Sequence, residues 1–314
     1  MMRRLAPMLA IATGLALPIR AEAAEARAAR PAMGTVLQIV VEADDLATAT
    51  ALAERAMSLA HRWDDVLTTW RPEGELARLN AQAGRGPFAA SSELRAALKR
   101  MQPLVTATDS AFNPTAGPLV AHWRSGAPGT ASALDPAPDL AAVLRVAADG
   151  VRLAAGASLE AGAIGKGIAL DAIARVLRAG GASSLWLDFG GSSQLGWSQG
   201  RRPRRLAVAG LGEGVVHGTV DVLDVAVSTS RATGPGAEVG PIVDPRTGDV
   251  VRAARVVTVL AAEAATADAW STALIVLGRD GVDKARAAGC EVFYEDEEGT
   301  VETPGFRSGK ISVR

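Results

Sequence analysis

Short strand-like segments follow one another in the second half of the chain, with no helical pattern between them. They are rich in apolar and β-branched residues and are bounded by turn residues. They span residues 184–187, 206–209, 218–222 and 225–228. Strands that come in runs, instead of alternating strictly with helices, are typical of α+β proteins with antiparallel sheets. We therefore predict an α+β fold in which antiparallel sheets pack against helices.

Helical patterns flank this run of strands on both sides. Apolar residues at helical spacing predict a helix capped by Asp44 and running to about Leu67, and a second helix capped by Ser91 or Ser92. Further helices are expected before the Gly180-Gly181 pair and over 265–277. Further strands are expected at 35–41, 255–260 and 289–294. No internal repeat or interior break demands a second unit, so a single globular unit is expected.

The first residues have the three parts of a secretory signal. Arg3 and Arg4 precede an apolar run over 5–19, and small residues follow at Ala21 and Ala23. The run is shorter than the roughly 18–20 residues that a membrane span needs. We predict that residues 1–23 are a cleavable signal, used by the Sec or the twin-arginine route, and that 24–314 form a periplasmic domain without stable membrane insertion.

The charge of the chain is nearly balanced. It has 33 Lys and Arg against 34 Asp and Glu, giving a formal net charge of −1. The basic residues are scattered, and long-range attraction to nucleic acid requires a basic surface. No nucleic-acid partner is expected. Cys290 is the single cysteine, so no intramolecular disulfide can form, and we interpret it as a small buried apolar residue.

A segment rich in Gly and Ala, residues 160–171, joins a loop to a helix start. Glycines there allow a ligand to approach the backbone, although a tight structural turn has the same composition. The segment is neither a phosphate-binding P-loop nor a dinucleotide fingerprint, because the glycine spacing differs from both.

Asp268 and Thr272 place a carboxylate and a hydroxyl four residues apart on one helical face. Oxygen ligands at this spacing suit Mg²⁺, which uses few protein oxygens together with water and phosphate. The alternative is an Asp that stabilises the N-terminus of its own helix.

Eight ordered motifs together are more specific than any one of them. They are Met33-Gly34-Thr35; residues 69–75 with Leu79-Asn80; 112–119 with Trp123; 162–167 with Asp171; Phe189-Gly190-Gly191; 227–230; 244–248; and Ala267-Asp268 with Thr272. In their order and spacing the chain resembles the ApbE family of FAD:protein FMN transferases, from Met33 to about Gly278. The resemblance implies the family's fold, which is T-fold-like.

The resemblance implies an exported enzyme that binds FAD with Mg²⁺, releases AMP, and joins the FMN phosphate to a Thr or Ser hydroxyl of a partner redox protein. It places the metal on Asp268, on Thr272 and on the carbonyl of Ala163, with Asp268 and Lys166 as the catalytic residues. Lys166 stabilises phosphate charge or fixes the loop. The residues placed near the flavin or adenosine are Met33, Trp70, Glu75, Asn80, Thr115, Lys166, Asp171 and Ser228.

The chain departs from the family pattern at a few positions. Pro241 stands where the family usually has a histidine, Asn113 and Ser192 replace Asp, Asp188 replaces Asn, and Arg231 replaces Gly. Two alternatives therefore stay open beside the transferase. One is an FAD diphosphatase that uses water as the acceptor. The other is a non-catalytic FAD-binding assembly factor for an exported redox enzyme, of the nitrous-oxide reductase maturation type.

Overall fold

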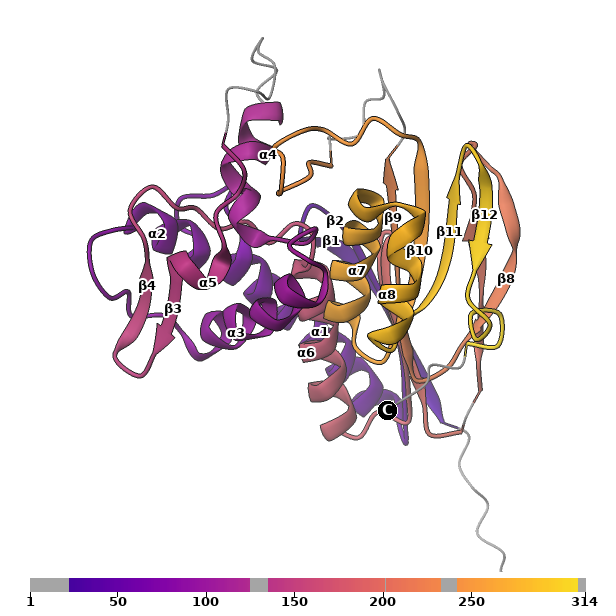
Figure 1. The fold of residues 1–314 in the computed structure, drawn as a ribbon. Helices are drawn as coiled ribbons and strands as arrows, with labels where there is room; N and C mark the ends of the chain where they lie inside the picture. Colours follow the sequence, from indigo (N-terminus) through magenta and orange to yellow (C-terminus); the bar gives the residue numbers. More distant parts are fainter. Residues whose placement is uncertain (1–22, 125–134, 201, 233–241, 310–314) are drawn as a thin grey trace, which may run out of the picture.

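Most of the predicted strand segments join one antiparallel sheet in the computed structural model, which describes residues 23–124, 135–200, 202–232 and 242–309 (Figure 1). Eight of the described strands follow the order β1-β2-β5-β6-β9-β10-β11-β12. They are β1 (Ala24–Ala32), β2 (Thr35–Ala43), β5 (Ser184–Phe189), β6 (Ser193–Ser198), β9 (Val225–Ala232), β10 (Arg255–Ala261), β11 (Glu291–Asp296) and β12 (Gly299–Glu302). Every neighbouring pair is antiparallel, which confirms the predicted fold class.

Three helices cover one face of this sheet. They are α1 (Leu46–Leu67), α6 (Gly165–Ala179) and α7 (Ala264–Leu277). α1 packs on β1 and β2, whereas α7 packs on β9, β10 and α6. α7 is apolar on nearly every side, and a helix of this kind is stable only when it is buried. Eleven of its residues are buried, so α7 lies in the centre of the main core.

The opposite face of the sheet is covered by a hairpin of β7 (Arg204–Ala209) and β8 (Val216–Val222). Trp186, Phe293 and Phe306 form a second apolar core between the hairpin and the sheet. Gly196 on β6 makes room for this core, because a Cβ there would lie 3.1 Å from the Trp186 ring. The molecule is thus layered as helices, sheet and hairpin.

A further group of elements lies to one side of the sheet (Figure 1). It consists of α2 (Glu75–Ala81), α3 (Ser92–Ala107), η1 (Pro114–Ala116), α4 (Gly117–Arg124), α5 (Leu140–Val143), β3 (Leu144–Ala147) and β4 (Gly150–Leu153). α3 contacts both α1 and α7. The remaining elements, η3 (Arg279–Gly281) and α8 (Val282–Ala287), follow α7.

One predicted helix start is wrong by a residue. The N-cap of α1 is Asp45, not Asp44: its Oδ1 accepts from Thr48 N at 2.9 Å. Asp44 and Asp45 are equally favourable N-cap residues by type, and only the fold shows which side chain reaches the amides of the first turn. Ser91 is the N-cap of α3, as predicted.

The predicted signal, residues 1–23, lies almost wholly outside the described residues. Among those described, no helix combines the length and the apolarity that crossing a bilayer requires.

Candidate functional site

The predicted metal ligands lie where α6 and α7 cross. Gly167 of α6 is pressed against α7: a Cβ on Gly167 would lie 2.3 Å from the carbonyl oxygen of Ala264. The backbone φ of Gly167 is not positive, so this glycine is required by space and not by conformation. Because α7 backbone atoms cannot move aside, only glycine permits this helix contact. The role of this glycine is therefore helix packing.

Asp268 is a buried carboxylate at this crossing, with 4% of its surface exposed. Its Oδ2 accepts from the Gly167 N–H at 3.0 Å, and its Oδ1 accepts from the hydroxyls of Ser193 and Ser228 at 2.9 Å each. These donors, and the positive end of the α6 dipole, compensate for burial of the charge. A carboxylate offers about four lone-pair positions, so one position remains for a further ligand.

A run of hydroxyl groups connects Asp268 with Thr272. Ser228 Oγ lies 3.0 Å from Ser271 Oγ, which lies 2.8 Å from Ser230 Oγ, which lies 3.4 Å from Thr272 Oγ1. Alternate residues of β9 point to the same face of the sheet, so Ser228 and Ser230 both face α7. The two predicted side-chain ligands therefore belong to one polar cluster.

The carbonyl of Ala163 lies at the same crossing. In a regular helix the Gly167 N–H would donate to that carbonyl, four residues earlier, but here it donates to Asp268. Within the described ranges no other backbone N–H takes its place. Carboxylate, carbonyl and hydroxyl oxygens are the donors that Mg²⁺ prefers. The predicted donor set therefore fits a hard cation, although the described residues contain no cluster of three His, Cys, Asp or Glu side chains with metal-site geometry.

A pocket of about 140 Å³ opens beside the glycine-rich loop. Met33, Trp70 and Lys166 line it, together with the carboxylate-bearing residues Asp64 and Glu160. Trp70 is 73% exposed, so its ring offers a flat stacking surface at this position. Among the described residues, no hydrogen bond or ion pair engages the ammonium of Lys166. The pocket therefore brings together three of the predicted residues, which come from distant parts of the sequence.

Met33 reaches the pocket from a strained hairpin turn. Met33 and Gly34 connect β1 to β2 with φ values of +50° and +76°, the pattern of a two-residue type I′ turn. Positive φ is unfavourable for a residue with a side chain, and such strain is concentrated at functional sites. The Met33 Cε would lie 3.5 Å from a Cβ on Gly165. The turn therefore directs Met33 toward the start of α6.

A sequence model of the ApbE family matches residues 33–294. The chain belongs to the ApbE family. Among curated relatives, the FAD:protein FMN transferase of Treponema pallidum is 31% identical over 294 residues, covering 82% of this chain and 80% of the relative. The FAD:protein FMN transferase of Klebsiella pneumoniae is 27% identical over 303 residues, covering 88% and 87%.

Solved structures of ApbE proteins share the fold. The ApbE protein of Thermotoga maritima superposes with a TM-score of 0.80 at 22% identity, covering 91% of this chain and 99% of that chain. Flavin transferase ApbE of Vibrio cholerae gives a TM-score of 0.75 at 23% identity, covering 90% and 97%. At this identity the likeness establishes the architecture alone.

Three residues that the ApbE resemblance places near the ligand make hydrogen bonds within the protein. The Glu75 carboxylate accepts from the N–H and the hydroxyl of Ser91, each at 2.6 Å. Asn80 is bonded to both backbone groups of Leu159, at 2.8 and 2.9 Å. Thr115 donates to the Pro138 carbonyl at 2.7 Å. These bonds fix the segments that they join, and contact of the three side chains with a ligand stays a prediction.

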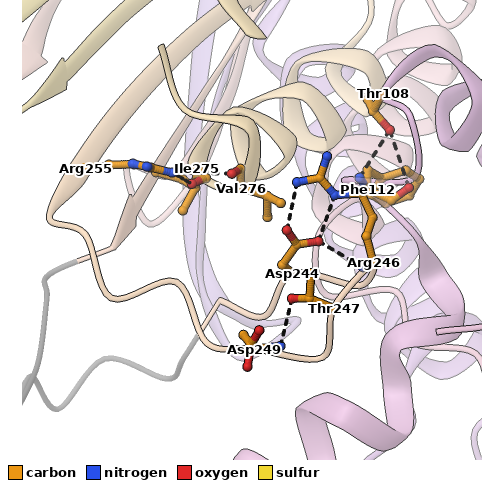
Figure 2. Close-up of polar contacts among 9 residues, drawn as sticks. All are labelled: Thr108, Phe112, Asp244, Arg246, Thr247, Asp249, Arg255, Ile275 and Val276. Carbon is orange, nitrogen blue, oxygen red and sulfur yellow. Dashed lines mark hydrogen bonds and ion pairs between the residues drawn. The ribbon is translucent and has the colours of Figure 1, made fainter. Parts of the chain in front are cut away.

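The ApbE turn Asp244-Pro-Arg-Thr-Gly248 is held by its own side chains (Figure 2). Arg246 donates to both carboxylate oxygens of Asp244, at 2.9 and 2.7 Å, and these hydrogen bonds raise the pKa of the guanidinium. Thr247 Oγ1 accepts from the N–H of Asp249 at 3.2 Å. The turn is anchored to α4, since Trp123 donates to the Gly248 carbonyl. Pro241, where ApbE proteins usually have histidine, lies outside the described residues.

The other departures from the ApbE pattern have local structural roles. Asp188 accepts from the Gly191 N–H at 2.6 Å, so it holds the Gly190-Gly191 turn as an asparagine oxygen also can. Asn113 donates through Nδ2 to the Pro138 carbonyl at 3.0 Å, which a carboxylate cannot do. Arg231 donates to two carbonyls of the loop between β7 and β8, at 2.6 Å each. These substitutions are therefore compatible with an intact ApbE fold.

Sequence reasoning missed several polar residues at the ApbE site. Ser271 follows Asp268 by three positions, so helical spacing offered a signal for it. Ser193 offered none, because it reaches Asp268 from a strand 75 residues earlier. Asp64 and Glu160 line the pocket but have the composition of ordinary surface residues. Ser193, Asp64 and Glu160 are brought to the site only by the tertiary packing.

Proposed function

We propose that this chain is an FAD:protein FMN transferase. It binds FAD at the Met33–Trp70–Lys166 pocket and transfers the FMN phosphoryl group to a Thr or Ser hydroxyl of a partner redox protein. The phosphoanhydride bond of FAD breaks, AMP leaves with the electron pair, a phosphoester bond forms, and the acceptor hydroxyl loses its proton. The observation that carries this proposal is the junction of an oxygen-donor cluster with a pocket at one loop, residues 160–167.

The proposal includes Mg²⁺ held by the Asp268 carboxylate, the Thr272 hydroxyl and the Ala163 carbonyl. When bound, Mg²⁺ supplies charge neutralisation for the diphosphate and for the departing AMP. The protein prepares this position by hydrogen-bonding Asp268 from Gly167, Ser193 and Ser228, which fixes the direction of the remaining lone pair. Fixed second-sphere bonds of this kind typically govern metal affinity.

The pocket residues have distinct tasks in the proposal. The Lys166 ammonium stabilises phosphate charge, which its lack of a partner among the described residues supports. Met33 and Trp70 pack against the flat rings of the ligand, where an aromatic face contributes stacking energy. The pocket volume of about 140 Å³ is below the roughly 300–1,000 Å³ typical for whole ligands. The pocket therefore holds only part of FAD, and the rest extends toward the oxygen-donor cluster.

An FAD diphosphatase is the second candidate, and Pro241 favours it. Proline has no side-chain group that accepts a proton, so residue 241 cannot deprotonate an acceptor hydroxyl as the family's usual histidine could. General-base catalysis contributes about 10²–10⁴-fold, so transfer without it is slower but not abolished. In the third candidate, an assembly factor, FAD is bound without turnover.

Export to the periplasm is part of the proposal. Residues 1–23 have the pattern of a cleavable signal, and β1 begins directly after them, at Ala24. Cleavage after Ala23 would therefore leave every described strand intact. The acceptor protein would be exported to the same compartment.

One assay separates the three candidates. Residues 24–314 are incubated with FAD and Mg²⁺, with and without a peptide containing an acceptor Thr, and AMP and peptide-bound flavin are measured. A transferase releases AMP when the peptide is present and attaches flavin to the peptide. A diphosphatase releases AMP and FMN even when the peptide is absent. An assembly factor leaves FAD intact in both cases.

Two variants test the metal assignment in the same assay. Asp268→Asn should lower AMP release by about 100-fold or more, because the metal contributes several kcal/mol and each 1.36 kcal/mol is tenfold. Asp45→Asn makes the same chemical change at the N-cap of α1, remote from the cluster, and serves as the control. Wild-type turnover in Asp268→Asn would refute the assignment.

A further inference from the structure

α7 carries two of the proposed metal ligands but lacks an N-terminal cap of its own. Its N-cap residue, Glu263, makes no capping hydrogen bond with its side chain and instead pairs with Arg100. The first amides of a helix have no partners within the helix, and leaving them unsatisfied inside a protein is costly. Another part of the chain must therefore supply the cap.

Asp171 of α6 supplies that cap. Its Oδ1 accepts from the N–H of Ala264 at 2.7 Å, and its Oδ2 accepts from the N–H of Ala265 at 3.0 Å. Both carboxylate oxygens are thus committed to the first turn of α7. The negative charge also lies at the positive end of that helix.

The contact between the helices is reciprocal. Asp171 of α6 binds the first turn of α7, while Asp268 of α7 binds the Gly167 N–H in the first turn of α6. The bonded amides belong to Gly167 and Ala264, the same two residues that make the close approach. These three hydrogen bonds, two from Asp171 and one from Asp268, restrict rotation as well as separation of the helices. The direction of the Asp268 carboxylate is consequently tied to the cap at Asp171.

Asp171 does not line the Met33–Trp70–Lys166 pocket. It lines a separate hollow of about 660 Å³ together with Arg175, Trp197 and Glu263. A residue that faces this hollow, with both oxygens bonded to α7, is poorly placed to contact a flavin in the pocket. Its position therefore points to an effect on the site through α7.

We propose that Asp171 is a positioning residue for the metal site and not a flavin ligand. By capping α7 from α6 it sets where Asp268 and Thr272 lie relative to the carbonyl of Ala163. This inference rests on the proposed metal site. Loss of the cap should weaken metal binding while leaving metal-free binding of FAD unchanged. Substitutions in the support of a metal site typically cost about 10–100-fold in affinity.

The test uses Asp171→Asn in the full mature chain, with Mn²⁺ as a paramagnetic probe. The Mn²⁺ dissociation constant is measured by electron paramagnetic resonance, and FAD affinity without metal by fluorescence quenching. We expect the Mn²⁺ dissociation constant to rise about 10-fold and FAD affinity to stay within about twofold. Asp45→Ala removes the side-chain cap from α1 and should leave both constants unchanged. In turnover, the Mg²⁺ concentration for half-maximal rate should rise, with the maximal rate recovered at excess Mg²⁺.

A rescue variant separates positioning from general loss of stability. Glu263 has the extended backbone of an N-cap, and Asp is among the best N-cap residues. Adding Glu263→Asp to Asp171→Asn gives α7 a cap of its own and should recover most of the Mn²⁺ affinity. Because the rescue adds a cap, it also restores folding if the single variant is unstable.

Three results would overturn the inference. The first is Mn²⁺ affinity in Asp171→Asn within twofold of wild type, and the second is a fall in metal-free FAD affinity, which would indicate a flavin contact. The third is an equal loss of Mn²⁺ affinity in Asp45→Ala, which would indicate general destabilisation. A wild-type protein that binds no Mn²⁺ would refute the proposed metal site itself, and with it this inference.

Discussion

The substitution Gly167→Ala adds only one methyl group but should destabilise the protein strongly. A Cβ at this position would lie 2.3 Å from Ala264 O and 2.7 Å from Ala265 Cα, whereas real Cβ contacts essentially never fall below 3.0 Å. α6 and α7 must therefore separate by about 0.7 Å, at a cost of about 1–3 kcal/mol for overpacking. The same movement stretches the charged hydrogen bond to Asp268, worth about 1.5–3 kcal/mol. Alanine returns about 1 kcal/mol in helix propensity, so the expected net loss is about 1.5–5 kcal/mol.

Gly165→Ala is the matched control for this prediction. It makes the same change two residues earlier, where a Cβ would meet Leu67 and Met33 at 3.5 Å, an ordinary contact distance. We expect its free energy of unfolding to stay within about 1 kcal/mol of wild type. Urea unfolding followed by circular dichroism measures both variants. The packing argument fails if Gly167→Ala is as stable as wild type, or if Gly165→Ala is equally destabilised.

Three further predictions concern groups that are buried or half-buried near the same core. Arg255 donates to the Ile275 and Val276 carbonyls at the C-terminal end of α7 (Figure 2). Arg255→Met keeps the apolar stem but should lower the free energy of unfolding by about 1.5–3 kcal/mol. An unchanged midpoint of urea unfolding would contradict this. Burial raises the pKa of the Cys290 thiol to about 12, so iodoacetamide at pH 8 should label it only after unfolding, as mass spectrometry can check; rapid labelling of native protein would contradict its burial. Burial also raises the pKa of Asp171 above its ordinary 3.8, so the native state binds this proton more readily than the unfolded chain, and stability from this group increases as the pH falls through the native pKa toward 3.8. The stability difference between wild type and Asp171→Asn should therefore shift in favour of wild type as the pH is lowered, and a difference independent of pH would refute that shift.

Local patterns predicted most of the elements that form the core. Helical spacing and the Gly278 stop located α7 to within one residue, and the run of short strands located β5, β7, β8 and β9. The strands β1, β6 and β12 and the small hairpin β3–β4 were missed. They are stabilised mainly by pairing with partners, β2 for β1, and their own composition is not strongly β-forming.

The sequence predicted a set of site residues, and the structure shows which of them lie close together. The ordered motifs indicated Asp268, Thr272, Ala163, Met33, Trp70 and Lys166, and the structure places these in one cluster and one adjoining pocket. The same motifs gave Asp171 and Glu75 as ligand-binding residues. In the structure Asp171 accepts hydrogen bonds from the start of α7, and Glu75 accepts them from Ser91. The residue type alone does not show whether a carboxylate binds a ligand or caps a helix.

The sequence by itself determined the periodicities, the antiparallel fold class and membership in the ApbE family. Only the tertiary structure decided that Gly167 is a packing glycine and that Asp171 caps a helix that begins 93 residues later. The physical reason is that burial and hydrogen bonding depend on which segments pack together, and segments far apart in the chain leave no local pattern of their contact. Periodicity is local, whereas the position of a buried charge is decided by the whole fold.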